Sequence, residues 1–287
     1  MERLTPVRTI VVALAAALAA ALVVAAPLFA QTRSPDEPAW LSYERGMHAY
    51  RDGEFGEALL HFRTALENRP IFPEATAAIG RVYRKDGNSD LAERHFRDAL
   101  DRSAQLYVPE DEYAIAYELA ALYASRDRTK DRLDTLESVI SDHPLWSEQE
   151  EGRRRTDAFL RVLRDDGIDR LLTLYRVPMD FAYQAFVDSG LIYLRDGRHN
   201  DAVRHLSVAT IQALSTAVTE IRRFELDYEY SRLAEVLARI DGDEALAGYA
   251  REVGLSRVLY SLAGALYWNQ VEQWGIPIWR VLADADG

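Results

Sequence analysis

The chain has 287 residues, of which 48% are hydrophobic, and it carries a formal net charge of -12. This acidic balance argues against binding to nucleic acid or to an anionic membrane surface, because both require a basic footprint. The chain contains no cysteine, which excludes thiol nucleophiles, disulfides, iron–sulfur ligation and lipid attachment through a cysteine.

The first thirty residues have the pattern of an export signal. Arg3 and Arg8 form a positive start, a run rich in Ala, Val and Leu follows, and Ala30 supplies the small residue that a signal peptidase needs. We interpret residues 1–30 as a cleaved signal peptide. An uncleaved anchor is the alternative, since the apolar run approaches the roughly 20 residues that span a bilayer. Both interpretations place the remaining chain outside the cytoplasm, in the periplasm or associated with the cell envelope.

Residues 31–38 are polar, contain two prolines and are predicted to be a linker. Beyond them, two stretches match each other at a shift of 34 residues. The matched pairs are Gly46 and Gly80, Gly53 and Gly87, Ala58 and Ala92, Phe62 and Phe96, and Ala65 and Ala99. Self-similarity at this period predicts a stack of helical hairpins, each burying its apolar face against the next. Phe62 and Phe96 are predicted to lie buried between layers.

This pattern resembles the tetratricopeptide repeat family, whose 34-residue units are helical hairpins with small or aromatic residues at fixed places. On this resemblance, residues 39–144 form three units, 145–182 a degenerate helical unit, 183–216 a further unit and 217–287 C-terminal capping helices. The predicted fold class is all-α: a right-handed α-solenoid of tetratricopeptide-like hairpins with a C-terminal helical cap.

Asp-Gly pairs fall between the two helices of a unit, where a glycine takes the left-handed conformation that ends a helix. These glycines are Gly53, Gly87 and Gly197. We expect the same turn at Gly167 and Gly242 in the divergent segments.

Three histidines, His61, His95 and His205, recur at one position of the repeat. Equivalent positions in successive units lie at least one helix-packing distance apart, about 8–10 Å, whereas metal-ligating atoms lie about 2 Å from the ion. We therefore predict no metal site and interpret these histidines as boundary residues of the second helix.

Acidic residues cluster around Trp146, at Asp165-Asp166 and around Asp227. Paired carboxylates divide acid and base roles only in a cleft that separates their pKa values, and Arg153 to Arg155 supply counter-charge here, so we interpret these clusters as solvated faces. The sequence has no phosphate-binding glycine loop, serine elbow, zinc-protease motif or calcium loop. We predict a protein that is not an enzyme and has no cofactor, with an enzyme of unrecognised site as the alternative.

The resemblance also implies a binding surface, because the first helices of the family's units line a concave groove. Aromatic side chains beside arginine have the composition of binding hot spots, and arginine favours carboxylates. The alternative is that the tyrosines pack between helices and the cations form a solvated rim. The predicted groove residues are Trp40, Tyr43, Met47, Tyr50, Arg51, Arg81, Arg84, Lys85, Tyr117 and Arg195.

A second aromatic cluster lies near the C-terminus. Its members are Tyr260, Tyr267, Trp268, Trp274 and Trp279. We interpret the cluster as packing onto the preceding layer, with contact to a membrane surface as the alternative.

The predicted function is that of an exported scaffold or adaptor that binds a protein or peptide segment in its groove, within a cell-envelope assembly. Nucleic acid is not an expected partner, and a membrane is expected only through an uncleaved N-terminal segment. The alternative is a small-molecule-binding accessory protein of a transport system, in which residues 145–182 close the groove into an apolar pocket. An enclosed cavity lined by Tyr and Leu would favour the small ligand, and an open channel the peptide.

Overall fold

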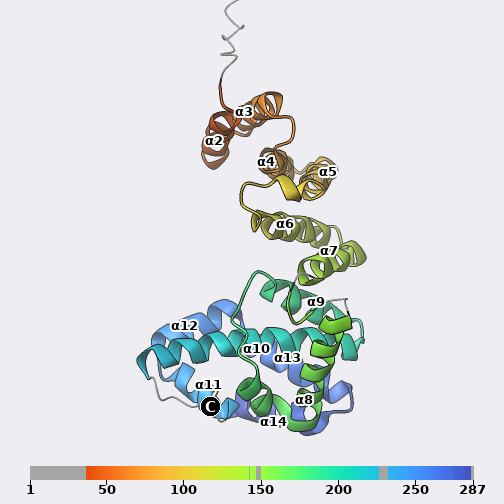
Figure 1. Cartoon of the computed structure of the whole chain (residues 1–287), viewed down its shortest axis with the longest axis vertical. Helices are drawn as coiled ribbons and strands as arrows, with labels where there is room; N and C mark the ends of the chain where they lie inside the picture. Colours follow the sequence, from red (N-terminus) through yellow and green to blue (C-terminus); the bar gives the residue numbers. More distant parts are fainter. Residues whose placement is uncertain (1–36, 142, 147–149, 226–231, 286–287) are drawn as a thin grey trace, which may run out of the picture.

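A computed structural model describes residues 37–141, 143–146, 150–225 and 232–285. The predicted signal peptide and most of the predicted linker lie outside these residues. Within the described ranges every regular element is helical and no strand occurs, which confirms the all-α class. None of the helices described there is both long and apolar enough to cross a lipid bilayer. Figure 1 shows a narrow column of hairpins that rises from a broader C-terminal body.

The column is a stack of helical hairpins. Its helices are α2 (Ala39–Arg51), α3 (Phe55–Asn68), α4 (Pro73–Lys85), α5 (Ser89–Leu100), α6 (Asp111–Ser125) and α7 (Thr129–Ser141). The hairpins pair α2 with α3, α4 with α5 and α6 with α7, and each packs mainly on the next along the chain. Their cores are correspondingly local, since small clusters of buried residues follow one another up the stack. The handedness of the superhelix stays a prediction.

Small residues let the helices of each hairpin approach closely. A Cβ atom added to Gly46 would lie 2.5 Å from the Phe62 ring, and one added to Gly80 would lie 3.0 Å from the Phe96 ring. Both phenylalanines are fully buried, so their predicted place between layers is confirmed. The same contact, a glycine backbone against a phenylalanine ring, therefore recurs in the first two hairpins.

The turns between paired helices follow the sequence pattern at three of the five predicted glycines. Gly53, Gly87 and Gly197 have the predicted positive φ. At Gly167 φ is also positive, but ψ is -175°, so the backbone is kinked there and does not form the predicted turn. The prediction for Gly242 is wrong: its φ of -77° is right-handed. The reason lies in the next residue, because the Asp243 carboxylate accepts hydrogen bonds from the backbone N–H groups of Ala245 and Leu246 and starts a new helix at once.

The C-terminal body is built around one long helix. Its elements are α8 (Glu150–Leu174), α9 (Tyr183–Arg195), α10 (His199–Phe224), α11 (Leu233–Asp241), α12 (Glu244–Val253), α13 (Leu255–Trp268) and α14 (Glu272–Ala285). Helix α10 pairs with α9 as a hairpin and also contacts α8, α11, α12 and α13. The boundary predicted at residue 216 thus falls inside α10, and a single hydrophobic cluster extends from α6 and α7 through the whole body.

Helix α14 docks on a break in α8. At Gly167 the backbone leaves helical geometry with φ of 82°, and an added Cβ would lie 2.6 Å from the Trp274 ring. The Trp274 indole N–H donates to the Arg164 carbonyl oxygen at 2.7 Å. Trp274 and Trp279 therefore pack as predicted, whereas Tyr260, Tyr267 and Trp268 are exposed. The docking fixes the break and, with it, the first half of α8.

Candidate functional site

Two tyrosines of the predicted groove serve the packing of the stack. Tyr43 lies against Phe62 and Phe72, with ring centroids 5.8 and 5.2 Å away. The Tyr117 hydroxyl donates to the Phe181 carbonyl oxygen at 2.5 Å and accepts from the Ala185 N–H at 3.1 Å. Tyr117 thereby joins α6 to the start of α9.

Two predicted groove cations share one carboxylate. The Arg81 guanidinium donates to Glu118 at 2.7 Å, and a nitrogen of Arg84 lies 3.7 Å from the other oxygen of Glu118. Tyr50, which precedes them in the set, is half-buried against Phe55. These side chains offer less free charge than the sequence pattern indicates.

The other predicted groove residues are accessible to different degrees. Trp40 is 56% exposed, and Met47 is half-buried. Arg51, Lys85 and Arg195 are exposed, and each is the last residue of its helix, where a cation interacts favourably with the helix dipole. They lie beside the Asp-Gly turns of their units. Whether this set binds a partner stays a prediction.

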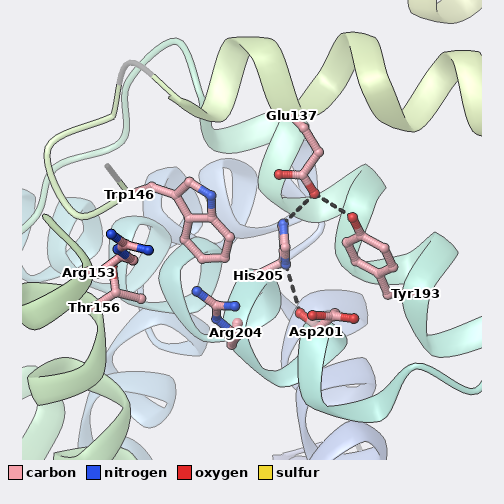
Figure 2. Close-up of a pocket in the computed structure, with 8 residues that line it drawn as sticks. All are labelled: Glu137, Trp146, Arg153, Thr156, Tyr193, Asp201, Arg204 and His205. Carbon is pink, nitrogen blue, oxygen red and sulfur yellow. Dashed lines mark hydrogen bonds and ion pairs between the residues drawn. The ribbon is translucent and has the colours of Figure 1, made fainter. Parts of the chain in front are cut away.

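A polar hollow of about 510 Å³ lies where the stack meets the body (Figure 2). It is framed by α7, the segment that follows α7, α8, α9 and α10. Its lining residues are Glu137, Trp146, Arg153, Thr156, Tyr193, Asp201, Arg204 and His205. Of these residues, the sequence pattern points to His205 alone as a possible ligand, because His61 and His95 share its position in the repeat.

Glu137, which is half-buried, is the centre of a hydrogen-bond network in this hollow. Its Oε1 atom accepts from the Tyr193 hydroxyl at 2.6 Å and lies 2.9 Å from Nε2 of His205. Nδ1 of His205 lies 2.7 Å from the Asp201 carbonyl oxygen. A carbonyl and a carboxylate both only accept, so both ring nitrogens are satisfied when the imidazole is doubly protonated. The network ties α7, α9 and α10 together.

The same contacts shift the pKa values of Glu137 and Tyr193. Burial raises the pKa of the Glu137 carboxyl, but the hydrogen bonds from His205 and Tyr193 and the charges of His205 and Arg204 outweigh it, and the net pKa is lowered. Burial, followed by the hydrogen bond to Glu137 and its charge, raises the pKa of the Tyr193 hydroxyl far above its usual value. The Glu137 carboxylate stays ionised and the Tyr193 hydroxyl stays protonated near neutral pH, so their hydrogen bond persists there and braces α7 against α9.

The interpretation of His205 as a boundary residue is wrong, because its side chain is 2% exposed. Trp146 covers it, with ring centroids 4.4 Å apart. The Arg204 guanidinium also lies over the Trp146 ring, 4.8 Å from its centroid. By contrast, His61 and His95 are only half-buried, and His95 stacks on Tyr83.

A second hollow, of about 600 Å³, adjoins the first and shares Arg153 and Arg204 with it. It lies between α8, α10 and the end of α13. Its lining residues are Arg153, Asp157, Leu160, Arg161, Leu163, Arg164, Asn200, Val203, Arg204, Leu266, Asn269 and Val271. We call the two hollows together the arginine cleft, after Arg153, Arg161, Arg164 and Arg204. No group of residues able to hold a metal ion occurs in the described part of the chain.

Fold and site together describe an α-solenoid of helical hairpins whose last hairpin, α9 with α10, is embedded in a helical body. The chain matches no protein-family model. It is 29% identical over 203 residues to an uncharacterised protein of Treponema pallidum (strain Nichols). The match covers 70% of this chain and 54% of that protein, so the chain spans about half the length of this curated relative.

Three solved structures are similar at low sequence identity. The crystal structure of MamA has a TM-score of 0.43 at 13% identity, with 86% of this chain and 91% of that chain covered. PilF of Pseudomonas aeruginosa has a TM-score of 0.39 at 15% identity, with 86% and 90% covered. BtubC (BKLC) from P. vanneervenii has a TM-score of 0.37 at 16% identity, with 84% and 78% covered.

Proposed function

We propose that the protein is a non-enzymatic scaffold that binds a segment of a partner protein. One observation carries this proposal: the hairpins of the column pack mainly on their neighbours along the chain, which leaves an elongated stack with a large surface for its volume (Figure 1). Stacks of this kind bind extended segments along their length.

The proposal includes export to the periplasm and a role in a cell-envelope assembly. Its support is the charge and hydropathy pattern of residues 1–30. A fusion of residues 1–38 to a reporter that is active only outside the cytoplasm should be active, and sequencing of the mature N-terminus should show whether cleavage occurs before Gln31. A reporter that stays inactive would contradict export.

Site-specific photocrosslinking in cells tests the scaffold function. Photoreactive residues placed at Trp40, Arg51 and Lys85, on the exposed edge of the stack, should each link to the same protein, and the same substitution at Arg280 on α14 should not. A matched pull-down compares an Arg51→Ala/Lys85→Ala/Arg195→Ala variant with the wild type. If no position links to a protein, or if the stack and α14 link to identical sets, the proposal is wrong.

The second candidate function is a small-molecule receptor that serves a transport system. One observation favours it: the segment 145–182 does frame both hollows of the arginine cleft, whose sizes fall within the range of roughly 300–1,000 Å³ common for ligand sites. The lining is charged and open at its rim, however, and does not have the Tyr and Leu composition expected for an apolar ligand. Failure of a panel of apolar metabolites to raise the melting temperature would remove this candidate.

A further inference from the structure

Among the described residues that line the arginine cleft, four arginines face three carboxylates, those of Glu137, Asp157 and Asp201. Of its four arginines, Arg164 pairs with Asp165 at 3.1 Å. In the described ranges Arg153, Arg161 and Arg204 have no ion-pair partner within 4 Å. The carboxylates nearby do not close this gap. Glu137 is hydrogen-bonded to His205 and its charge is also felt by Arg204, and Asp201 pairs with Arg198. Asp157 is the third carboxylate of the lining. This surplus stands out in a chain whose net charge is -12.

Arg204 is held in place at the point where the two hollows meet. Its guanidinium carbon lies over the Trp146 ring, 4.8 Å from the centroid, and its Nε atom is buried without a hydrogen-bond partner among the described residues. A buried donor that lacks an acceptor is unfavourable. Figure 2 shows Arg153 and Arg204 reaching into the same hollow beside Trp146. An incoming carboxylate would supply acceptors for both guanidinium groups, and bidentate pairing is the strong form of this contact.

The shape of the cleft favours a polypeptide over a small anion. The adjoining hollows, about 510 and 600 Å³, exceed what one inorganic anion fills. Trp146 provides an aromatic wall in the first hollow, and Leu160, Val203 and Leu266 add apolar surface in the second. Alternating charged and apolar contacts along a continuous cleft suit an extended chain with acidic side chains. Nucleic acid is disfavoured, because the remainder of the protein is acidic.

We propose that the arginine cleft binds an acidic segment of the partner protein, with its carboxylates paired to Arg153, Arg161 and Arg204 and one of its side chains against Trp146. This inference rests on the proposed scaffold function and names the chemistry of the partner. The cleft lies between α8, α10 and α13, at the foot of the stack, and is separate from the predicted groove residues on α2 and α4.

The test measures binding of a fluorescein-labelled peptide of ten glutamates by fluorescence anisotropy, with the matched peptide of ten glutamines as the control. We expect micromolar binding of the glutamate peptide and at least tenfold weaker binding of the glutamine peptide. An Arg153→Ala/Arg161→Ala/Arg204→Ala variant should bind the glutamate peptide at least tenfold more weakly. Affinity should also fall as salt rises, since exposed charge pairs are screened.

A matched variant separates this site from general charge. Arg170, Arg176 and Arg257 are exposed and do not line the cleft, so their combined change to Ala removes the same formal charge and should leave peptide binding within about twofold of wild type. Circular dichroism melting of both variants checks folding. Charge-reversal of Arg161 alone, which is exposed, provides a variant that folds even if loss of Arg204 does not allow folding, and it too should weaken binding.

The proposal is overturned if the glutamate peptide fails to bind at millimolar concentration, if both triple variants lose binding equally, or if inorganic phosphate binds the cleft and the peptide does not. The crosslinking experiment on α2 and α4 reports on the scaffold function independently. Crosslinks there without peptide binding here would retain the scaffold and remove the acidic segment.

Discussion

The column of hairpins and the C-terminal body use the same kind of helix pair but distribute their cores differently. In the column, buried residues fall into separate clusters, each shared by neighbouring helices. In the body, one cluster extends over α8 to α14, and it also takes in buried residues of α6 and α7 at the foot of the column. The column should therefore lose structure hairpin by hairpin, whereas the body should unfold as one unit. The regular hairpins of the column leave a long exposed surface. The irregular packing of the body encloses the two hollows of the arginine cleft on several sides.

The largest expected effects come from truncating one buried ring in each region. Phe96 in the column and Phe186 in the body are both fully buried, so Phe96→Ala and Phe186→Ala should each lower the free energy of unfolding of their own region by about 3–5 kcal/mol. Hydrogen exchange should show faster exchange of α2 to α6 alone for Phe96→Ala, and of α8 to α14 together for Phe186→Ala. Exchange changes that spread equally in both variants would remove the contrast.

Next come the glycines at which two helices touch. Gly46→Ala in the column and Gly190→Ala at the junction would place a Cβ 2.5 Å from Phe62 and 2.7 Å from Leu206. Overpacking of this kind costs about 1–3 kcal/mol. The control is Gly56→Ala, where an added Cβ meets nothing within 4 Å and the gain in helix propensity should stabilise α3 by up to about 1 kcal/mol. Urea unfolding measures the free energy of unfolding of the three variants. A change of the same sign in Gly56→Ala as in the other two would contradict the prediction.

The brace at Glu137 should give the junction an acid-dependent stability. Because the pKa of Glu137 is lowered in the folded protein, its contribution is present above the unfolded value near 4.5 and is lost as pH falls through the lower, folded pKa. Glu137→Gln should cost about 1–3 kcal/mol at pH 7, and the difference from wild type should shrink in acid.

Urea midpoints at about pH 7 and pH 3 check this prediction. Glu57→Gln serves as the control, since Glu57 is exposed on α3 and should show little difference at either pH. A Glu137→Gln deficit that stays constant across this range would show that the carboxylate is not the group that titrates.

The smallest expected effects are at helix starts. Asn88 caps α5 by accepting from the Leu91 N–H, and Asp243 caps α12. Replacement of either by Ala should cost about 1 kcal/mol. In the column the loss should speed hydrogen exchange of α4 and α5 without moving the melting of the body, and for Asp243→Ala it should lower the melting temperature of the body. If Asn88→Ala lowered the melting temperature of the body as well, the column and the body would not have independent cores.

The column could be predicted from the sequence because its rules are local. Gly46 with Phe62 and Gly80 with Phe96 recur at one period, and the Asp-Gly turns fix where each helix ends. The body follows no such period. At Gly167 a tryptophan more than one hundred residues away determines how the backbone breaks, and at Gly242 the neighbouring Asp243 changes the turn.

The arginine cleft was beyond sequence reasoning for a similar reason. Glu137 and His205 lie 68 residues apart, and the position of His205 in the repeat indicated only a helix boundary. Arg153 was interpreted as counter-charge to nearby acidic residues, and Arg204 carried no signal. Convergence of α8, α10 and α13 on one cleft depends on tertiary packing alone.

Helix α10 has a mechanical consequence for the molecule. It runs unbroken for 26 residues, a rod of about 39 Å at 1.5 Å per residue, with its first half in the last hairpin and its second half in the body. A load applied to the tip of the column would pass down successive layers into this rod. The column contacts the body through α7 and α9, and α9 is paired with α10. The orientation of the column relative to the body therefore depends on how α10 is held.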